Sequence, residues 1–413
     1  MKLESFKGAK LKESVAVIGS GPSGLSCAYQ LAKRGHRVTV FESENKAGGM
    51  LVSGIPEYRL PKEIVERDIS RMREAGVTIK TNSTLGKDFS IEDLRKKGFK
   101  AFYLALGAWK EAALQIPGTN LSGFIGSLSF LKDYNSERIK KVHGVYCSLK
   151  DNTQIVFTGK KIAVVGGGNA AMDVARTCVR LGADQVHVIY RRTKDAMPAI
   201  PEEVEEAQKE GVKFHFLLIP SEIKGKAGKV CAIECLYTAP GKFDSSARRQ
   251  PCATDKKFLL PVDIVISAIG GKPELPDRLM KKFSFTDWGA LVVDPVTLQT
   301  NIEDIFAGGD LVTGGGTVID SIAQGEKAAI SIARFFNGED LYKDRFVIKG
   351  ERKEVSYIDP SAEVRNQSRL AQAKMSMEKR LQAFGEVELG YTKTQAALEA
   401  NRCLRCDRKE NEG

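Results

Sequence analysis

Short runs of apolar residues alternate along this chain with stretches in which apolar residues recur every three to four positions. Short apolar runs bounded by turn-forming residues are typical of strands buried in a parallel sheet, and the longer period is typical of amphipathic helices. Their alternation predicts an α/β fold. The predicted buried strands are residues 15–18, 38–41, 101–106, 161–165, 186–190, 263–269 and 305–307. The predicted helices include residues 25–34, 62–75, 172–181 and 317–336.

The first predicted strand and helix are joined by a glycine-rich loop. Gly19, Gly21 and Gly24 have the spacing G-x-G-x-x-G, and Glu42 follows the next strand. In a dinucleotide site the first glycine makes a tight turn, the second admits a pyrophosphate to backbone N–H groups, and the third lets helix and strand pack closely. The acidic residue then binds a ribose hydroxyl. A glycine turn without a ligand is the alternative, but the complete order of elements favours a dinucleotide site.

A second loop of this kind occupies residues 166–171, with the spacing G-x-G-x-x-A. The strand after it ends in Arg191 and Arg192 instead of an acid. An acid would repel a 2′-phosphate, whereas two guanidinium groups can bind it through charge-assisted hydrogen bonds. The loop therefore predicts an NADP(H) site. The alternative is that one arginine binds phosphate while the other is a solvated surface residue.

The third glycine-rich stretch follows the strand at residues 305–307. It contains Gly309 and Asp310, and a predicted helix begins at about Thr317. In a flavin site, Asp310 would hold the ribityl or pyrophosphate region. The helix N-terminus at Thr317 and Val318 would stabilise negative charge on the reduced ring.

Composition narrows the classes of function. A chain of 413 residues should form two or three domains. The formal net charge of +11 is spread along the chain, which disfavours nucleic-acid binding and suits an acidic protein partner or phosphates. We find no apolar run of membrane-spanning length and no signal-peptide pattern, so we expect a cytoplasmic protein whose eight cysteines are mostly reduced.

Three further segments carry open alternatives. Residues 229–237 and 257–261 predict strands around a polar loop at 240–255. Residues 361–384 predict a basic amphipathic helix that packs on its own body or on a partner. Cys403 and Cys406 form a C-x-x-C pair, which is half of a metal site for Zn or an iron–sulfur cluster shared with a partner, or else a free thiol pair.

Several segments of the chain resemble the glutamate synthase small-subunit family. That family also includes the NADPH-binding part of dihydropyrimidine dehydrogenase and the large subunit of NADH-dependent ferredoxin:NADP oxidoreductase. GIPEYRLP and YRR…MPA…EE are more specific than the glycine loops. The matching segments are GSGPSGLSCAYQLAKRGHRVTVFE, GGMLVSGIPEYRLP, YLALGAW, VVGGGNAAMDVARTCVRLGA, YRRTKDAMPAIPEEVEEA and AGGDLVTGGGTVIDSIAQGEKAA.

The resemblance implies two Rossmann-like dinucleotide-binding domains, with an NADP(H) domain inserted into an FAD domain and a C-terminal helical tail. The implied bounds are residues 12–117 and 286–340 for FAD, 118–285 for NADP(H) and 341–413 for the tail. The residues implied at FAD are Gly19, Gly21, Pro22, Ser23, Glu42, Gly49, Met50, Leu51, Arg59, Leu106, Gly107, Gly309, Asp310, Thr317 and Val318. Those implied at NADP(H) are Gly168, Asn169, Ala170, Arg191 and Arg192.

The family further implies an FAD-dependent NADP(H) oxidoreductase subunit. Hydride would pass between NADPH and FAD, and electrons would pass to partner subunits that carry iron–sulfur clusters or flavin. An electron-bifurcating transhydrogenase is one such complex. Cofactor positioning suffices for hydride transfer, so we assign no catalytic acid, base or nucleophile.

Two departures and two alternatives qualify this expectation. Family members usually carry a cysteine-rich N-terminal domain, whereas here the FAD loop begins almost at once and NRCLRCD stands at the other end. The first alternative is a glutamate synthase small subunit that feeds a glutamine-using large subunit. The second is a non-catalytic, nucleotide-binding structural subunit. A disulfide reductase is disfavoured because no C-x-x-C lies in the expected nicotinamide domain.

Overall fold

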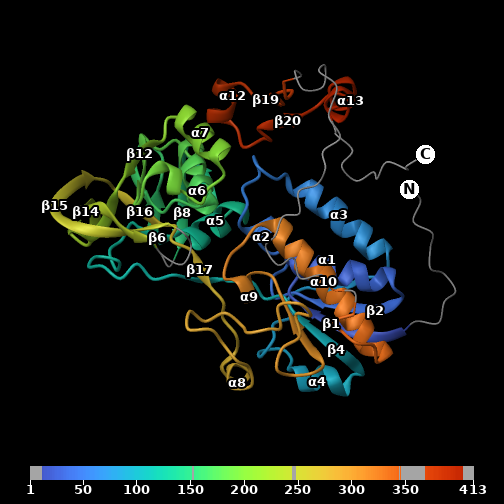
Figure 1. The fold of residues 1–413 in the computed structure, drawn as a ribbon. Coiled ribbons are helices and arrows are strands. Elements are labelled where there is room, and N and C mark those ends of the chain that lie inside the picture. Colours follow the sequence, from blue (N-terminus) through green and yellow to red (C-terminus); the bar gives the residue numbers. More distant parts are fainter. Residues whose placement is uncertain (1–11, 151–152, 244–247, 344, 346–367, 403–413) are drawn as a thin grey trace.

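Two parallel sheets form the framework of the computed structural model, which describes residues 12–150, 153–243, 248–343, 345 and 368–402 (Figure 1). The first sheet consists of β1 (Lys12–Ile18), β2 (His36–Phe41), β3 (Thr78–Lys80), β4 (Phe99–Leu104) and β18 (Ile305–Ala307), in the order β18-β4-β1-β2-β3. The second consists of β6 (Phe124–Gly126), β10 (Lys161–Val165), β11 (Gln185–Tyr190), β12 (Lys213–Phe216) and β16 (Ile264–Ser267), in the order β12-β11-β10-β16-β6.

Helices cover both sheets, and this explains the continuous apolar runs. Successive side chains of β1 point to opposite faces, so that Val15 and Val17 belong to one buried cluster and Ala16 and Ile18 to another. The helices are α1 (Pro22–Lys33), α2 (Met50–Ser53), α3 (Lys62–Glu74), α4 (Ile91–Lys96), α5 (Ser127–Asn135), α6 (Asn169–Arg180), α7 (Pro201–Lys209), α8 (Asp277–Met280), α9 (Asp310–Thr313), α10 (Val318–Asn337), α12 (Met377–Gln382) and α13 (Lys393–Ala400).

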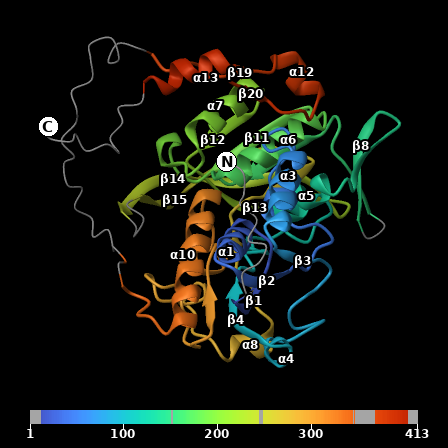
Figure 2. The same cartoon turned by 90° about the vertical axis from the view of Figure 1, so that its right-hand side faces the viewer.

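Helices α1 and α10 lie side by side although they are far apart in the sequence (Figures 1 and 2). Gly325 allows this close approach, because a Cβ atom there would lie 2.3 Å from the backbone oxygen of Ser23. The Ser26 hydroxyl also donates to the backbone oxygen of Ile322 at 2.9 Å. The packing brings the N-termini of the two helices to the same edge of the first sheet.

Antiparallel strands surround the two parallel sheets. The three-stranded sheet β13-β14-β15 lies beside the second parallel sheet. The pair β5 and β17 links the segment after β4 to the segment after β16. The strands concerned are β5 (Lys110–Glu111), β7 (Ile139–Val142), β8 (Val145–Lys150), β9 (Thr153–Val156), β13 (Leu218–Lys226), β14 (Lys229–Phe243), β15 (Arg249–Pro261), β17 (Gly271–Lys272), β19 (Ala373–Lys374) and β20 (Glu388–Gly390).

The prediction of a polar loop at residues 240–255 is wrong for most of these residues. Strand pairing continues past Thr238, which is opposite Ala253, to Phe243, which is opposite Arg249. Antiparallel pairing satisfies the backbone hydrogen-bonding groups, and a ribbon that faces water needs no apolar pattern to form. The result is a long β14–β15 hairpin.

The single helix predicted at residues 361–384 is also wrong in its described part, which begins at residue 368. There β19 pairs with β20, and α12 is a short helix between them. Phe384, from the predicted apolar stripe, packs on the rings of Tyr134 and Tyr146, with centroid distances of 5.3 and 5.9 Å. Tertiary contacts therefore override the helical period, and this side chain packs on the protein's own body.

Glu206 on α7 anchors residues 368–402, which we call the tail segment (Figure 2). Lys374 lies 3.1 Å from its carboxylate, and Arg380 donates to the other oxygen. Burial would raise the pKa of Glu206, but hydrogen bonds from Lys374, Lys209 and Arg380 outweigh burial and lower the pKa to about 2. The stabilisation is therefore present above the ordinary pKa of 4.5 and is lost as the pH falls towards 2.

The variant Glu206→Gln should loosen the tail segment. Loss of the charge takes a carboxylate partner from Arg380, Lys374 and Lys209, of which Lys374 still has Glu388 at 3.6 Å. We expect docking of the tail segment to weaken by about 3 kcal/mol. Hydrogen exchange at the amides of Arg380 and Val387, which both donate to backbone oxygens, measures the effect. Glu205→Gln, on the exposed side of α7, is the control. Equal protection in both variants would contradict the anchoring role.

In the described residues, no helix combines the length and the apolar character that a membrane span requires.

Candidate functional site

Two glycines of the first loop serve packing within the protein. Gly19 has φ +101°, and a Cβ atom there would lie 2.3 Å from the backbone oxygen of Ala105. A Cβ atom at Gly24 would lie 2.0 Å from the backbone oxygen of Gly19. The loop after β1 therefore lies directly against the end of β4, and only glycine fits at both positions.

Gly21 differs from these two glycines. Its φ of −66° is accessible to any residue, and a Cβ atom there would meet nothing within 4 Å. Packing within the protein thus gives no reason for glycine at this position. Gly21 is the N-cap of α1, with Pro22 in the first turn, and no side chain caps the helix. The open space at a helix N-terminus fits the pyrophosphate of a dinucleotide, as the sequence predicts.

Glu42 follows β2 and is 5% exposed. One carboxylate oxygen accepts a hydrogen bond from the backbone N–H of Ser20 at 2.9 Å, and the other accepts from that of Glu44 at 2.8 Å. These bonds fix the carboxylate beside the glycine loop. A carboxylate has further acceptor capacity, so its role at a ribose hydroxyl stays a prediction.

The segment from Gly49 to Leu51 packs on the same loop. Gly49 has φ +53°, and a Cβ atom there would lie 2.8 Å from the Cα atom of Gly21. The N–H of Gly48 donates to the Ser20 hydroxyl at 3.0 Å. Gly49, Met50 and Leu51 are thus close to Gly21, and Leu106 and Gly107 follow β4 at the same sheet edge.

The third predicted stretch reaches this edge from β18. A Cβ atom at Gly309 would lie 3.0 Å from the Cβ atom of Ser23, which joins the first and third stretches. Asp310 accepts a hydrogen bond from the N–H of Gly316 at 3.1 Å. Burial raises the pKa of Asp310, and this hydrogen bond offsets part of the shift. Thr317 caps α10, and Val318, the first helical residue, is 38% exposed.

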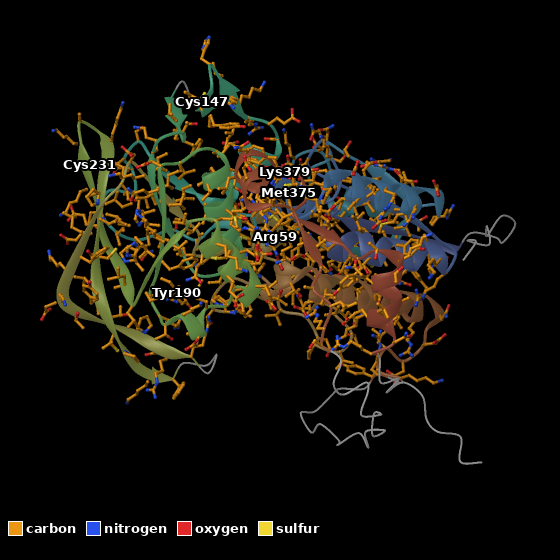
Figure 3. The ribbon with its side chains drawn as sticks, turned by 90° about the horizontal axis from the view of Figure 1, so that it is seen from above. Arg59, Cys147, Tyr190, Cys231, Met375 and Lys379 are labelled. Atoms are coloured by element: carbon orange, nitrogen blue, oxygen red, sulfur yellow. The ribbon has the colours of Figure 1, made fainter. Side chains whose placement is uncertain are left out.

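Arg59 lies where the first parallel-sheet unit meets α6 and α7. Its guanidinium is 2.7 Å from Asp173 on α6 and 3.4 Å from Glu203 on α7 (Figure 3). Burial raises the pKa of Asp173 to about 6, although Arg59 acts to lower it. The structure therefore places Arg59 in a contact between the two parallel-sheet units, and its predicted position along the flavin stays a prediction.

Next to this contact, two charged stripes meet, one on α6 and one on α7. They were not identified from the sequence. The spacing of three and four positions within the predicted helices was the available signal. The stripe on α6 is Asp173, Arg176 and Arg180, and the stripe on α7 is Glu203, Glu206 and Glu210.

Glu210, at the C-terminal end of α7, joins the two stripes. Its side chain is fully buried and accepts paired hydrogen bonds of 2.7–3.0 Å from Arg176 and Arg180. The ring of Tyr58 covers both guanidinium groups, at 5.0 and 4.0 Å from its centroid. The segments GIPEYRLP and YRR…MPA…EE meet where Arg59 pairs with Glu203, and Tyr58 of the first segment covers the buried arginines beside this pair.

The second glycine loop repeats the pattern of the first. A Cβ atom at Gly166 would lie 2.2 Å from the backbone oxygen of Ala268, whereas one at Gly168 would come no closer than 4.0 Å to Pro198. Gly168 is the N-cap of α6 and has φ −92°. Its environment is open, as that of Gly21 is, and fits a second dinucleotide.

The other predicted NADP(H) residues surround this loop. Asn169 accepts a hydrogen bond from the N–H of Ile200 at 3.0 Å, and Ala170 is exposed in the first turn of α6. Arg191 and Arg192 follow β11 and line one pocket. Arg191 is exposed, whereas Arg192 is only 8% exposed.

The predicted metal pair, Cys403 and Cys406, lies outside the described residues. Within the described ranges we find no group of three or more histidine, cysteine or acidic side chains that could hold a metal ion. Zinc or an iron–sulfur cluster at the C-x-x-C pair stays a prediction.

Comparison with known proteins identifies the family. The family model described as pyridine nucleotide-disulphide oxidoreductase matches residues 13–326. The chain belongs to this family. Within it, the glutamate synthase [NADPH] small chain of Escherichia coli strain K12 is 34% identical over 327 residues, which cover 78% of this chain and 68% of that protein. The predicted family resemblance is confirmed.

Longer relatives match nearly the whole chain. The NADP(+)-dependent formate dehydrogenase subunit beta of Moorella thermoacetica is 38% identical over 403 residues. The match covers 96% of this chain but 55% of the relative, so this chain spans just over half of that protein's length.

Among solved structures, Mycobacterium tuberculosis FprA in complex with NADPH has the same fold, with a TM-score of 0.67 at 20% identity. The match covers 79% of this chain and 85% of FprA. These findings confirm the α/β fold with Rossmann-like units. Family membership confirms the predicted NAD(P)H-dependent flavin oxidoreductase with FAD and NADP(H) as cofactors.

Proposed function

We propose that this chain is the FAD-dependent NADP(H) oxidoreductase subunit of a larger electron-transfer complex. Hydride passes between NADPH and FAD, and partner subunits with iron–sulfur clusters or flavin exchange the electrons. The relatives named as a small chain and as a beta subunit support the existence of partner subunits. The cytoplasm is the proposed location, and the predicted domain bounds at residues 117/118, 285/286 and 340/341 are part of the proposal.

The observation that carries this proposal is the pair of open glycines, Gly21 and Gly168. Each caps a helix after a parallel strand, and neither is required to be glycine by its backbone angles or by its neighbours. Backbone N–H groups at these helix ends can hold two pyrophosphates. Such a chain can bring together two dinucleotides, each bound at its own sheet.

Bound FAD supplies both hydride and single-electron chemistry, which side chains do not provide. The protein's own part is to bind and orient. Glu42 is fixed at the first loop, Asp310 is fixed by Gly316, and the start of α10 stabilises negative charge near Thr317. The ion pair of Arg59 with Asp173 sets the two units against each other.

A glutamate synthase small subunit is the second candidate. The match to the Escherichia coli small chain, at 34% identity over 78% of this chain and 68% of that protein, supports it. A glutamine-using partner would then receive the electrons. An electron-bifurcating complex is the other arrangement that we propose for test, and copurified partner subunits distinguish the two.

Anaerobic stopped-flow absorbance of the flavin band tests the proposed reaction. The flavin band of purified protein with bound FAD should bleach at least tenfold faster with NADPH than with NADH, because Arg191 and Arg192 favour the 2′-phosphate. Equal rates would contradict the NADP(H) assignment but would leave the assignment as an oxidoreductase in place. A bound flavin that neither nucleotide reduces would contradict the proposal and favour a structural subunit.

A further inference from the structure

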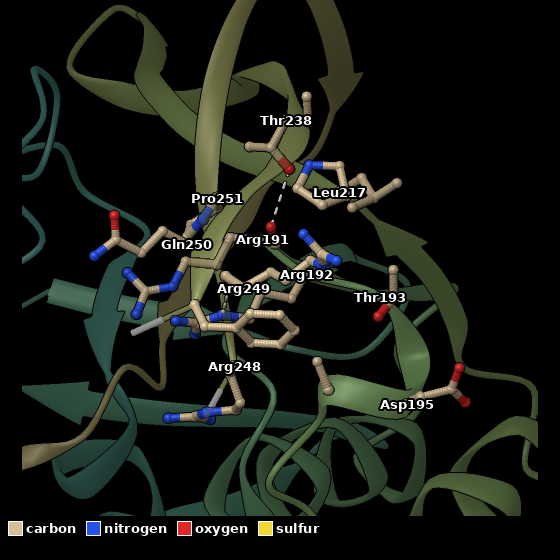
Figure 4. Close-up of a pocket in the computed structure, with 14 residues that line it drawn as sticks. Arg191, Arg192, Thr193, Asp195, Leu217, Thr238, Arg248, Arg249, Gln250 and Pro251 are labelled. Carbon is tan, nitrogen blue, oxygen red and sulfur yellow. Dashed lines mark hydrogen bonds between the residues drawn. The ribbon is translucent and has the colours of Figure 1, made fainter. Parts of the chain in front are cut away.

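A pocket of about 260 Å³ lies where the end of β11 meets the β14–β15 hairpin (Figure 4). Arg191 and Arg192, which the sequence predicts at NADP(H), line it from just after β11. Arg248 and Arg249 line it from the start of β15. Arg249 comes 57 positions after Arg192 in the sequence, so only the folding of the hairpin brings the two arginine pairs to one cavity.

Hydrogen bonds hold the hairpin against β11. The Arg192 side chain donates to the backbone oxygen of Arg249 at 2.9 Å. The Thr238 hydroxyl donates to the backbone oxygen of Arg191 at 3.0 Å, and its N–H donates to the backbone oxygen of Leu217 at 2.8 Å (Figure 4). The pocket is therefore a defined part of the fold.

The chemistry of the lining fits a phosphate beside an aromatic base. Among the described residues that line the pocket, four arginines and one acid, Asp195, give a formal charge of +3. Phe243 is 64% exposed, and the guanidinium of Arg249 lies 4.5 Å from the centre of its ring. An exposed ring next to a guanidinium offers a flat surface on which a purine can stack.

We infer that the β14–β15 hairpin binds the 2′-phosphoadenosine end of NADPH, with Arg248 and Arg249 at the 2′-phosphate and Phe243 against the adenine. The hairpin thereby sets the preference for NADPH over NADH together with Arg191 and Arg192. This inference rests on the proposed NADP(H) function. It adds specificity residues from a segment far from the glycine loop.

Binding of adenosine phosphates, measured by calorimetry, tests the inference separately from turnover. Arg248→Gln and Arg249→Gln should each weaken binding of adenosine 2′,5′-bisphosphate about tenfold, because each removes one charge-assisted hydrogen bond. Binding of 5′-AMP should change less than about twofold, since it lacks the 2′-phosphate. Phe243→Ala should weaken both ligands by the same factor, because both contain adenine. Flavin content should be unchanged in all variants.

Lys242→Gln is the matched control, because it removes one positive charge from the same hairpin at a residue that does not line the pocket. It should leave both affinities within about twofold. Unchanged binding in both arginine variants, or equal weakening in the lysine control, would overturn the inference. If the unmodified protein binds the bisphosphate no better than 5′-AMP, the proposed NADP(H) function itself fails. If the unmodified protein prefers the bisphosphate to 5′-AMP and both arginine variants keep this preference, only the assignment of the hairpin is wrong.

Discussion

Gly21→Ala is expected to weaken FAD binding severely while leaving the fold intact. An added methyl group meets no protein atom within 4 Å and fits the backbone angles, so it costs the folded state little. The same methyl group occupies the space that a pyrophosphate needs. We expect FAD affinity to fall at least roughly 100-fold, or about 2.8 kcal/mol. Flavin content of the purified protein and titration of the FAD-free protein with FAD measure the loss.

The same substitution at two other glycines provides matched controls. Gly24→Ala places its Cβ atom 2.0 Å from a backbone oxygen, so it should lower the melting temperature as well as the flavin content. Gly168→Ala should keep its flavin but lose rapid reduction by NADPH, because its open space lies at the second sheet. Normal flavin content in Gly21→Ala would remove the first loop from the FAD site.

Glu210→Gln should have the largest effect on stability. The carboxylate is fully buried between Arg176 and Arg180, and its neutralisation takes the charge partner from Arg180 and leaves Arg176 paired with Glu203. Breaking a buried ion pair in this way costs about 3–5 kcal/mol of unfolding free energy. Native-state hydrogen exchange of the amides of α6 and α7 reports this loss locally, which avoids assuming that the whole chain unfolds in one step.

The pH dependence gives this prediction a second readout. Burial would raise the pKa of Glu210, but hydrogen bonds from Arg180 and Arg176 outweigh burial and hold the pKa below its ordinary value of 4.5. Its stabilisation is thus complete above pH 4.5 and is lost as the pH falls further. Protection of α6 and α7 should weaken in acid in the unmodified protein, and the variant should lack this part of the acid dependence.

Glu205→Gln on the same helix is exposed and should change the unfolding free energy by less than about 0.5 kcal/mol. A loss in Glu210→Gln no larger than in this control would show that the buried cluster contributes no net stability.

The local pattern of the chain was sufficient to predict much of the dinucleotide-binding framework. The strands at residues 15–18 and 161–165, their glycine loops and the helices after them follow short-range rules, because backbone sterics and a period of 3.6 act within one turn or one loop. The positions that the structure leaves open, Gly21 and Gly168, belong to those motifs. The break of the predicted tail helix has the opposite origin, since strand pairing and the contacts of Phe384 with distant rings compete with its periodicity.

Only the tertiary structure decided which charges meet. Arg59 is next to Leu60 and Pro61 in sequence, yet its partner Asp173 lies 114 positions away. Arg248 and Arg249 stand in what reads as a polar loop, and strand pairing across the hairpin carries them to the end of β11. The sequence determined the two open glycine loops at which we propose that dinucleotides bind, because those loops are built from neighbouring residues. The contact between the units and the four-arginine pocket depend on long-range pairing, whose partners no local pattern specifies.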